Sequence, residues 1–215
     1  MRRLTKIQEP QVLVDNRTDW TTACATPPLT DAKKYRYRHR DIKARLAEET
    51  SEKCIYCEQK VAPVAPSHVE HKTPVSVDAS KRFDWANLTL ACPECNRRKN
   101  AFYSNHIGFL DPYDDDVEYA LIHRGPIVTW RPGESRAELS VRYLALDGSE
   151  RNELVRKKID FLSKLDNAVE RYVSSKGTEL EPLLRKQLKS WGSIEAEFSG
   201  MVRSMFSLAG LDELL

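Results

Sequence analysis

The chain has 215 residues, of which 40% are hydrophobic and 31% are charged, and its formal net charge is +2. This is the composition of a water-soluble protein with one good core, or with a small domain and appended helices, and the charge does not by itself indicate a nucleic-acid binder. No apolar run approaches the roughly 18 residues of a membrane span, and no apolar stretch follows Met1 as in a secretory signal. We therefore expect a cytoplasmic protein with no membrane partner.

Residues 1–49 divide into an arm and a helix. Residues 1–29 place three prolines between short apolar pieces, and we expect them to form an extended arm that packs on the body of the protein. Thr30 or Asp31 can cap a helix that we expect to end near Glu49.

This expected helix is strongly basic. Residues 33–45 hold seven Lys or Arg side chains and one acidic residue, Asp41. Such a run is usually a solvated helix face, but beside a site that acts on nucleic acid it would contact phosphates. The residues for which we predict phosphate contacts are Lys33, Lys34, Arg36, Arg38 and Arg40.

Two Cys-x-x-Cys pairs, Cys54/Cys57 and Cys92/Cys95, frame the next segment. Four thiolates can close the tetrahedral shell of one zinc ion at about 2.3 Å each, and such a closed site is structural. The alternative is four separate buried thiols, which the paired spacing disfavours. Residues 58–91 make the interval longer than in a compact zinc ribbon, so we expect the chemistry to lie in this insert.

We expect residues 109–146 to form a β-rich connector. An acidic cluster at Asp111 and residues 114–116 could bind a metal, but Asp-rich turns are common helix starts and loop residues, which favours a structural role. The strands predicted next cover residues 119–122, 127–130 and 139–144.

From Asp147 the hydrophobic pattern changes to a helical period. It predicts one helix along the stripe from Leu154 to Tyr172, a second from Thr178 to about Trp191, and a third from Ser193. Acidic and basic side chains balance in this region, which favours packing or contact with a partner over binding to DNA.

The insert holds the parts that phosphodiester hydrolysis needs: an activated water, charge stabilisation and a hold on the phosphate. A neutral histidine can take a proton from water, and carboxylate and amide oxygens suit a hard divalent cation. Glu70 and His71 occupy adjacent strand positions and should point to opposite faces. Asn96 should lie near the start of a helix, and its amide can complete a metal site. Basic residues on that helix can hold flanking phosphates; they are Arg97, Arg98 and Lys99.

These residues resemble the HNH endonuclease family, whose ββα-metal finger carries the pattern (D/E)H…N…(H/N). The resemblance implies that His71 is the general base and that Asn87 orients the loop bearing it. It also implies that Glu70 and Asn96 bind the catalytic metal. Many HNH fingers carry extra zinc knuckles, which would account for the four cysteines.

Two positions depart from the common pattern. Glu70 stands where Asp is more frequent and is longer by one methylene. Asn96 stands where His is frequent, and an amide oxygen favours Mg²⁺ or Mn²⁺. His68 shares the strand face of Glu70; it is either a solvent-exposed spectator or a helper of the metal or phosphate. His106 and His123 belong to no motif.

Residues 1–10, 109–112 and 144–156 resemble, less specifically, the HNH subunit of the Septu anti-phage system, the PtuB family. The resemblance implies an ABC-type ATPase partner, PtuA-like, that would dock on the C-terminal helices or the N-terminal arm.

The expected fold is α+β: a ββα-metal HNH finger stapled by a zinc site of four cysteines, with a basic N-terminal helix and a helical C-terminal region. The expected divisions are an arm (1–29), the nuclease domain with its basic helix (30–108), a β-rich connector (109–146) and the helical region (147–215).

The expected function is metal-dependent hydrolysis of nucleic acid, most of all DNA, giving 5′-phosphate and 3′-hydroxyl ends. Two alternatives stay open: a non-catalytic zinc module that binds nucleic acid or a protein, and a stand-alone restriction-type HNH nuclease without an ATPase.

Overall fold

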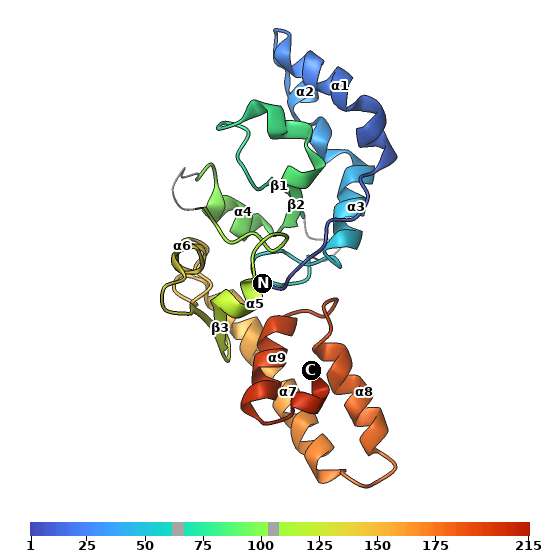
Figure 1. Ribbon diagram of the computed structural model, residues 1–215, viewed down its shortest axis with the longest axis vertical. Coiled ribbons are helices and arrows are strands. Elements are labelled where there is room, and N and C mark those ends of the chain that lie inside the picture. The colour runs from blue at the N-terminus through green and yellow to red at the C-terminus, as the bar shows by residue number, and fades with distance from the viewer. Residues whose placement is uncertain (62–66, 103–107) are drawn as a thin grey trace.

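The computed structural model describes residues 1–61, 67–102 and 108–215. The molecule is elongated: helices from the beginning and from the end of the chain lie at opposite ends, with two small sheets between them (Figure 1). The helices are α1 (Gln11–Ala25), α2 (Asp31–Lys34), α3 (Arg40–Glu49), α4 (Pro93–Lys99), α5 (Val117–Ala120), α6 (Ser135–Tyr143), α7 (Asn152–Ser174), α8 (Glu181–Trp191) and α9 (Ser199–Leu208). The strands are β1 (His68–His71), β2 (Leu88–Ala91), β3 (Leu121–Arg124) and β4 (Ile127–Trp130). The α+β prediction is confirmed.

Strands β1 and β2 and helix α4 form a compact unit. The strands are antiparallel, with His68 opposite Ala91 and His71 opposite Leu88. Helix α4 begins after Cys92, whose Sγ accepts the backbone N–H of Cys95 at 3.3 Å, and Pro93 occupies the first turn, where no N–H is needed. The second cysteine pair therefore starts the helix that follows β2.

Helix α1 contradicts the expected extended arm over residues 1–29. The part before Pro10 does lack helix and strand, and the N–H of Leu4 donates to the carbonyl of Pro112 at 2.9 Å. The part that follows is helical, with Pro10 at its N-cap. Because α1 buries only Leu13 completely, its apolar stripe is too weak to reveal the helix in the sequence.

The single basic helix expected over residues 30–49 is broken into α2, a short 3₁₀ helix η1 (Arg36–Arg38) and α3. His39 has an extended backbone (φ −52°, ψ 141°), and its Nδ1 accepts the N–H of Asp41 at 3.3 Å. The histidine therefore caps α3 and interrupts the helix before it. The break allows Tyr37 to be buried.

The connector holds two of the three expected strands. Strands β3 and β4 form an antiparallel hairpin around Gly125, whose φ of +59° suits glycine at this turn. Helix α6 replaces the expected strand over residues 139–144. It buries Ala137, Ser140 and Val141, which are spaced by three and four positions as on one face of a helix.

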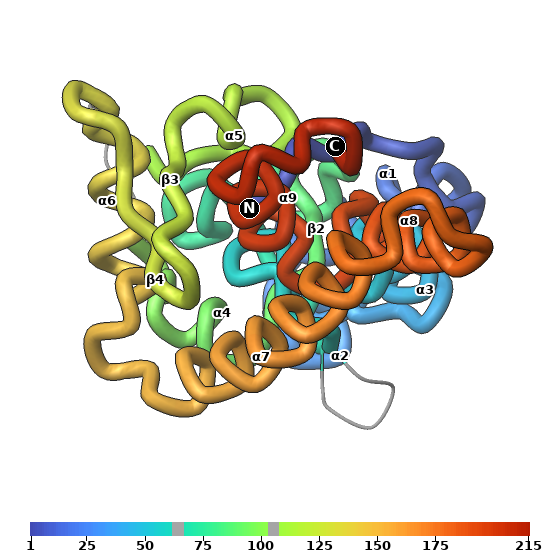
Figure 2. Tube along the Cα trace, turned by 90° about the horizontal axis from the view of Figure 1, so that it is seen from below, coloured from blue at the N-terminus to red at the C-terminus, as the bar shows by residue number. Residues whose placement is uncertain are grey.

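The C-terminal region is helical as expected. Helices α7 and α8 form a hairpin, and α6 with the β3–β4 hairpin lies on the other side of the molecule from α8 (Figures 1 and 2). Helices α7, α8 and α9 enclose a second, smaller core around Leu165, Tyr172, Leu188 and Phe206. No helix among the described residues has both the length and the apolar character needed to cross a membrane.

The third expected helix begins later than Ser193. Phe198 lies in the left-handed region (φ 55°), its N–H donates to the carbonyl of Glu58, and α9 starts at Ser199. The Glu58 carboxylate accepts the hydroxyl of Ser199 at 3.1 Å and the N–H of Gly200 at 3.0 Å. Glu58, which directly follows the first cysteine pair, thus fixes the start of α9.

Candidate functional site

The four paired cysteines converge. Their sulfur atoms all lie within 4.8 Å of one another, and all four residues are buried. Each pair comes from one knuckle, the first in the loop after α3 and the second at the start of α4. The arrangement fits one tetrahedral metal ion with no open position, as expected of a structural site.

Two buried cations of the C-terminal region interact with the cysteines: Arg151 contacts Cys95 directly, and Lys158 interacts with Cys57 only through its charge. Arg151, 7% exposed, donates from Nη1 to the Sγ of Cys95 at 3.2 Å and to the carbonyl of Leu144 at 3.3 Å. Lys158 is 2% exposed and donates to the carbonyl of Pro126. Burial opposes the charged form of Arg151, but the cysteines raise its pKa above the usual value. Zinc with four thiolates carries two negative charges, which these cations would offset.

Glu70 of β1 pairs with Lys99 of α4. The two side chains are buried, at 5% and 1% exposure, and the Nζ of Lys99 lies 2.5 Å from Oε1 of Glu70. The same ammonium donates to the carbonyl of His71 at 2.8 Å. Burial raises the pKa of Glu70, and the positive charge of Lys99 opposes this. Lys99 was expected to contact phosphate, but its charge is used inside the protein.

Asn96 of α4 contacts His68 of β1. The Nδ2 of Asn96 lies 2.8 Å from the Nδ1 of His68; because an amide nitrogen only donates, Nδ1 accepts this hydrogen bond. Asn96, His68 and Glu70 all line the same groove.

His71 is held as a neutral base. Its Nε2 lies 3.0 Å from the carbonyl of Arg82, which can only accept, so Nε2 carries the ring proton and Nδ1 keeps its lone pair. The ring of Tyr37 packs edge-on against the imidazole at 4.5 Å between centroids. Burial, followed by nearby positive charges, lowers the pKa of His71 to about 4. The imidazole is therefore neutral at pH 7 and able to take a proton.

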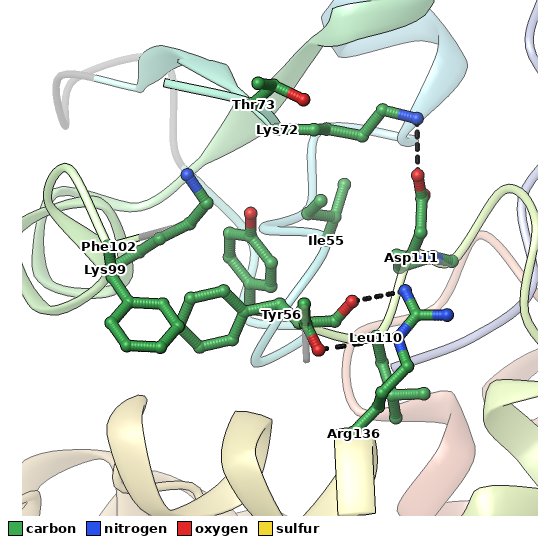
Figure 3. A pocket seen from close by; sticks show the side chains of 12 residues that line it. Ile55, Tyr56, Lys72, Thr73, Lys99, Phe102, Leu110, Asp111 and Arg136 are labelled. Atoms are coloured by element: carbon green, nitrogen blue, oxygen red, sulfur yellow. Dashed lines mark hydrogen bonds and ion pairs between the residues drawn. The ribbon is translucent and has the colours of Figure 1, made fainter. Parts of the chain in front are cut away.

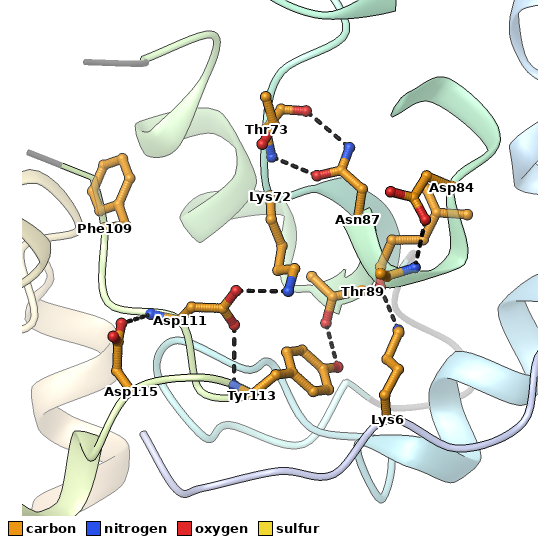
Figure 4. Close-up of polar contacts among 12 residues, drawn as sticks. Lys6, Lys72, Thr73, Asp84, Asn87, Thr89, Phe109, Asp111, Tyr113 and Asp115 are labelled. Atoms are coloured by element: carbon orange, nitrogen blue, oxygen red, sulfur yellow. Dashed lines mark hydrogen bonds and ion pairs between the residues drawn. The ribbon is translucent and has the colours of Figure 1, made fainter. Parts of the chain in front are cut away.

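Asn87 braces the loop that follows His71. Its Oδ1 accepts the N–H of Thr73 at 2.7 Å, and its Nδ2 donates to the carbonyl of Thr73 at 3.0 Å (Figure 4). The Nδ2 also donates to the carbonyl of Lys81 at 3.1 Å. Lys72, next in this loop, pairs with Asp111 at 2.6 Å. The side chain of Asn87 therefore ties the loop that follows His71 to Lys81, the residue before Arg82, whose carbonyl holds the His71 ring.

A groove of about 910 Å³ runs past these residues. Its lining includes His68, Glu70, His71 and Asn96. Its other lining residues include five basic side chains, namely Lys34, Arg38, Lys43, Arg82 and Arg97. Anionic phosphates and the candidate base can therefore meet in one place.

The eight basic residues predicted to contact nucleic acid separate into two groups. Lys34, Arg38 and Arg97 line the groove. Arg38 also stacks over Tyr35 at 4.1 Å. The others do not line it. Lys33 donates to two carbonyls, Arg36 lies over Trp20, and Arg40, with 91% of its side chain exposed, pairs with Asp41. Arg98 pairs with Glu94 and Glu150, and Lys99 is buried.

A second, smaller cavity of about 160 Å³ lies beside Tyr56, Lys72 and Asp111 (Figure 3). Its charged groups include two that are already paired: Lys72 with Asp111, and Arg136 with the carbonyl of Phe109 at 2.6 Å. The acidic cluster near it is also engaged, because Asp115 accepts the N–H of Asp111 at 2.7 Å and pairs with Arg136. These contacts support the structural role expected of the cluster.

Several groups at the site have no motif in the sequence. Tyr37, the Arg82 carbonyl and Arg151 reach the site only through folding. The sequence spacing does indicate that Lys99 is buried. Cys92, Cys95 and Lys99 are three and four positions apart, which places them on one face of α4. His123 is buried apart from the groove, and His106 lies outside the described residues.

Residues 54–102 match the family model described as HNH endonuclease. This segment is therefore similar to HNH endonuclease domains. The match begins at the first cysteine of the first knuckle and includes β1, β2 and α4, and therefore Glu70, His71, Asn87 and Asn96. HNH domains are typical of metal-dependent nucleases, which accords with the expected nuclease class and with a nucleic-acid partner. No curated protein matched the chain.

Proposed function

We propose that this protein is a metal-dependent endonuclease that hydrolyses phosphodiester bonds of nucleic acid, with DNA as the favoured substrate. The observation that carries the proposal is the groove in which a neutral His71, with its Nδ1 lone pair available, adjoins the oxygen donors of Glu70 and Asn96 and several basic side chains. The HNH match over residues 54–102 supports it independently.

The chain's own residues supply the proton transfer and the hold on the substrate. Lys34, Arg38 and Arg97 bind the phosphate backbone. His71 accepts a proton at Nδ1 from the attacking water, while its Nε2–H stays on the Arg82 carbonyl. Asn87 keeps this ring orientation by bracing the loop.

The oxygens of Glu70 and Asn96 would hold Mg²⁺ or Mn²⁺, which when bound stabilises negative charge on the leaving 3′ oxygen. The donor set fits this group, since Glu70 and Asn96 offer oxygen ligands and both line the groove. The expected products carry 5′-phosphate and 3′-hydroxyl ends. The cysteine cluster would hold zinc in a purely structural role.

The test is cleavage of plasmid DNA and of total RNA with Mg²⁺ or Mn²⁺ by the wild type, His71→Ala and His39→Ala. His39 is the matched control, because it caps α3 and does not line the groove. We expect His71→Ala to lose roughly 10²- to 10⁴-fold in rate and to keep its zinc and melting temperature. Unchanged cutting by His71→Ala would reject the proposed base, and the better substrate would decide between DNA and RNA.

A non-catalytic zinc module is the alternative from a different class. It predicts that the wild type binds nucleic acid or a protein but cuts neither DNA nor RNA under any metal. It also predicts that His71→Ala keeps the biological activity of the wild type.

We further propose that the chain acts as a Septu-type effector with an ABC-type ATPase. The support is the sequence resemblance at residues 1–10, 109–112 and 144–156. An exposed apolar tip on the α7–α8 hairpin offers a place for the partner: Val173, Leu180 and Leu183 are each at least half exposed.

The partner proposal is tested by co-purification with an ATPase encoded next to this gene. Leu183→Glu should weaken the complex, whereas Leu208→Glu, on α9 and 74% exposed, is the matched control. Full activity with no adjacent ATPase would favour a stand-alone restriction-type nuclease.

A further inference from the structure

The contact between His68 and Asn96 joins the two elements that frame the groove. His68 begins β1, Asn96 lies in α4, and 28 positions separate them in the sequence. Both are half-buried and both line the groove. The Nδ1 lone pair of His68 is directed at the Asn96 amide, 2.8 Å away, and is therefore turned toward a group expected to bind metal.

The separation of these two groups suits a shared ion. Two ligand atoms at right angles around a cation, each about 2.1 Å from it, are about 3.0 Å apart. A half-turn of the Asn96 amide places Oδ1 where Nδ2 now lies, close to this separation from the imidazole nitrogen. The two lone pairs would then repel each other unless a cation lay between them. The hydrogen bond therefore holds the His68 imidazole and the Asn96 amide at a separation that one metal ion can bridge.

We propose that His68 is a nitrogen ligand of the divalent cation bound in the groove, beside the amide oxygen of Asn96. Glu70, two positions along the same strand, supplies the carboxylate. This inference rests on the proposed function, because it concerns the metal of that same site. It replaces an all-oxygen donor set with a mixed one, which favours Mn²⁺ and similar transition metals over Mg²⁺.

His68 could instead act only as a positioning residue that orients the amide through the hydrogen bond. Either role weakens cleavage when His68 is removed, so activity does not separate them. Direct coordination leaves a mark of its own, which is magnetic coupling between the imidazole nitrogen and the unpaired electrons of bound Mn²⁺.

The deciding experiment is pulsed electron paramagnetic resonance of Mn²⁺ bound to the full chain, with zinc retained, without nucleic acid. Unlabelled protein is compared with protein in which histidine carries ¹⁵N. We expect a histidine nitrogen coupling in the wild type and in His71→Ala, and its loss in His68→Ala. A wild-type spectrum without histidine nitrogen coupling, or one that His68→Ala leaves unchanged, would overturn the proposal.

Metal binding by calorimetry gives a second readout. His68→Ala and Asn96→Ala should each weaken Mn²⁺ binding by roughly 10- to 100-fold. His68→Asp restores an oxygen ligand and should shift the preference toward Mg²⁺; a wild-type preference retained in this variant would count against ligation by nitrogen.

The two proposals can fail separately. A protein that shows the nitrogen coupling but cuts no substrate would overturn the proposed function and keep the His68 ligand. A protein that cuts through His71 but shows no coupling would overturn the His68 ligand alone.

Discussion

The cysteine cluster and the groove are two candidate metal centres in and around residues 54–102, the segment that matches the HNH family model, and they are built in opposite ways. The cysteine cluster has four soft thiol donors, all buried, with no room for a further ligand. The groove has hard or borderline donors on His68, Glu70 and Asn96, and it opens to about 910 Å³ of space. A closed set of donors can only hold the fold together, whereas an open one leaves positions for water and substrate.

In each centre a buried cation contacts one of the candidate metal ligands, and the two cations would affect metal binding differently. Arg151 lies against a cysteine sulfur and would balance the charge of a permanently bound zinc ion. Lys99 lies against the carboxylate of Glu70, where a catalytic ion would add to the positive charge or displace it. The comparison predicts that a metal ion held by the cysteines would be part of the fold, and that a metal ion in the groove would exchange.

The largest expected effect is loss of the cysteine centre. Cys57→Ser should lose the zinc and unfold the HNH domain, because structural zinc contributes free energy of folding on the order of 10 kcal/mol. Circular dichroism and zinc content would measure this, with Cys24→Ser, outside the cluster, as the control. A folded, zinc-free Cys57→Ser protein would contradict the structural role.

The next effect concerns the ion pair under the groove. Lys99→Met should lower the free energy of unfolding by about 3–5 kcal/mol, because it leaves Glu70 as a buried charge without its partner. Mn²⁺ should restore part of this loss and raise the melting temperature more in the variant than in the wild type. If Mn²⁺ had the same effect on both proteins, Glu70 would not be a ligand.

A smaller effect is expected from the cation beside the cysteines. Arg151→Met should weaken zinc retention by roughly 10- to 100-fold, the usual range for groups that support metal ligands. Zinc release to a chelator measures this, and Arg98→Met is the matched control, because Arg98 pairs with Glu94 and Glu150 at the surface. Equal release rates in the two variants would show that Arg151 does not stabilise the centre.

The smallest effect is expected from the phosphate contacts. Arg38→Ala should weaken substrate binding uniformly across sequences and reduce the slope of log affinity against log salt by about 1. Arg40→Ala should change neither, because Arg40 does not line the groove. Salt titrations of binding to short DNA duplexes would compare them; equal slopes would place the DNA elsewhere.

The predictable parts of the site are those that depend on short spacing. Two Cys-x-x-Cys pairs, an adjacent Glu70 and His71, and Asn96 directly after a cysteine each indicate chemistry because neighbouring positions have few possible geometries. The fold class could be predicted for the same reason. The boundaries and types of the helices and strands were less predictable. The apolar face of α1 is too weak to indicate a helix. The short alternation in residues 139–144 predicted a strand, but the buried residues there have helical spacing and form part of α6.

The sequence by itself determined that four cysteines have the spacing of a shared metal site, and that a pattern resembling HNH nucleases runs from Glu70 to Asn96, just past the last cysteine. Only the tertiary structure decided which basic residues line the groove, that Lys99 neutralises Glu70, that the Arg82 carbonyl sets the tautomer of His71, and that His68 reaches Asn96. The physical reason is distance along the chain. Local spacing fixes the relation of near neighbours, whereas contacts between residues 28 positions apart, such as His68 and Asn96, arise only when β1 packs against α4.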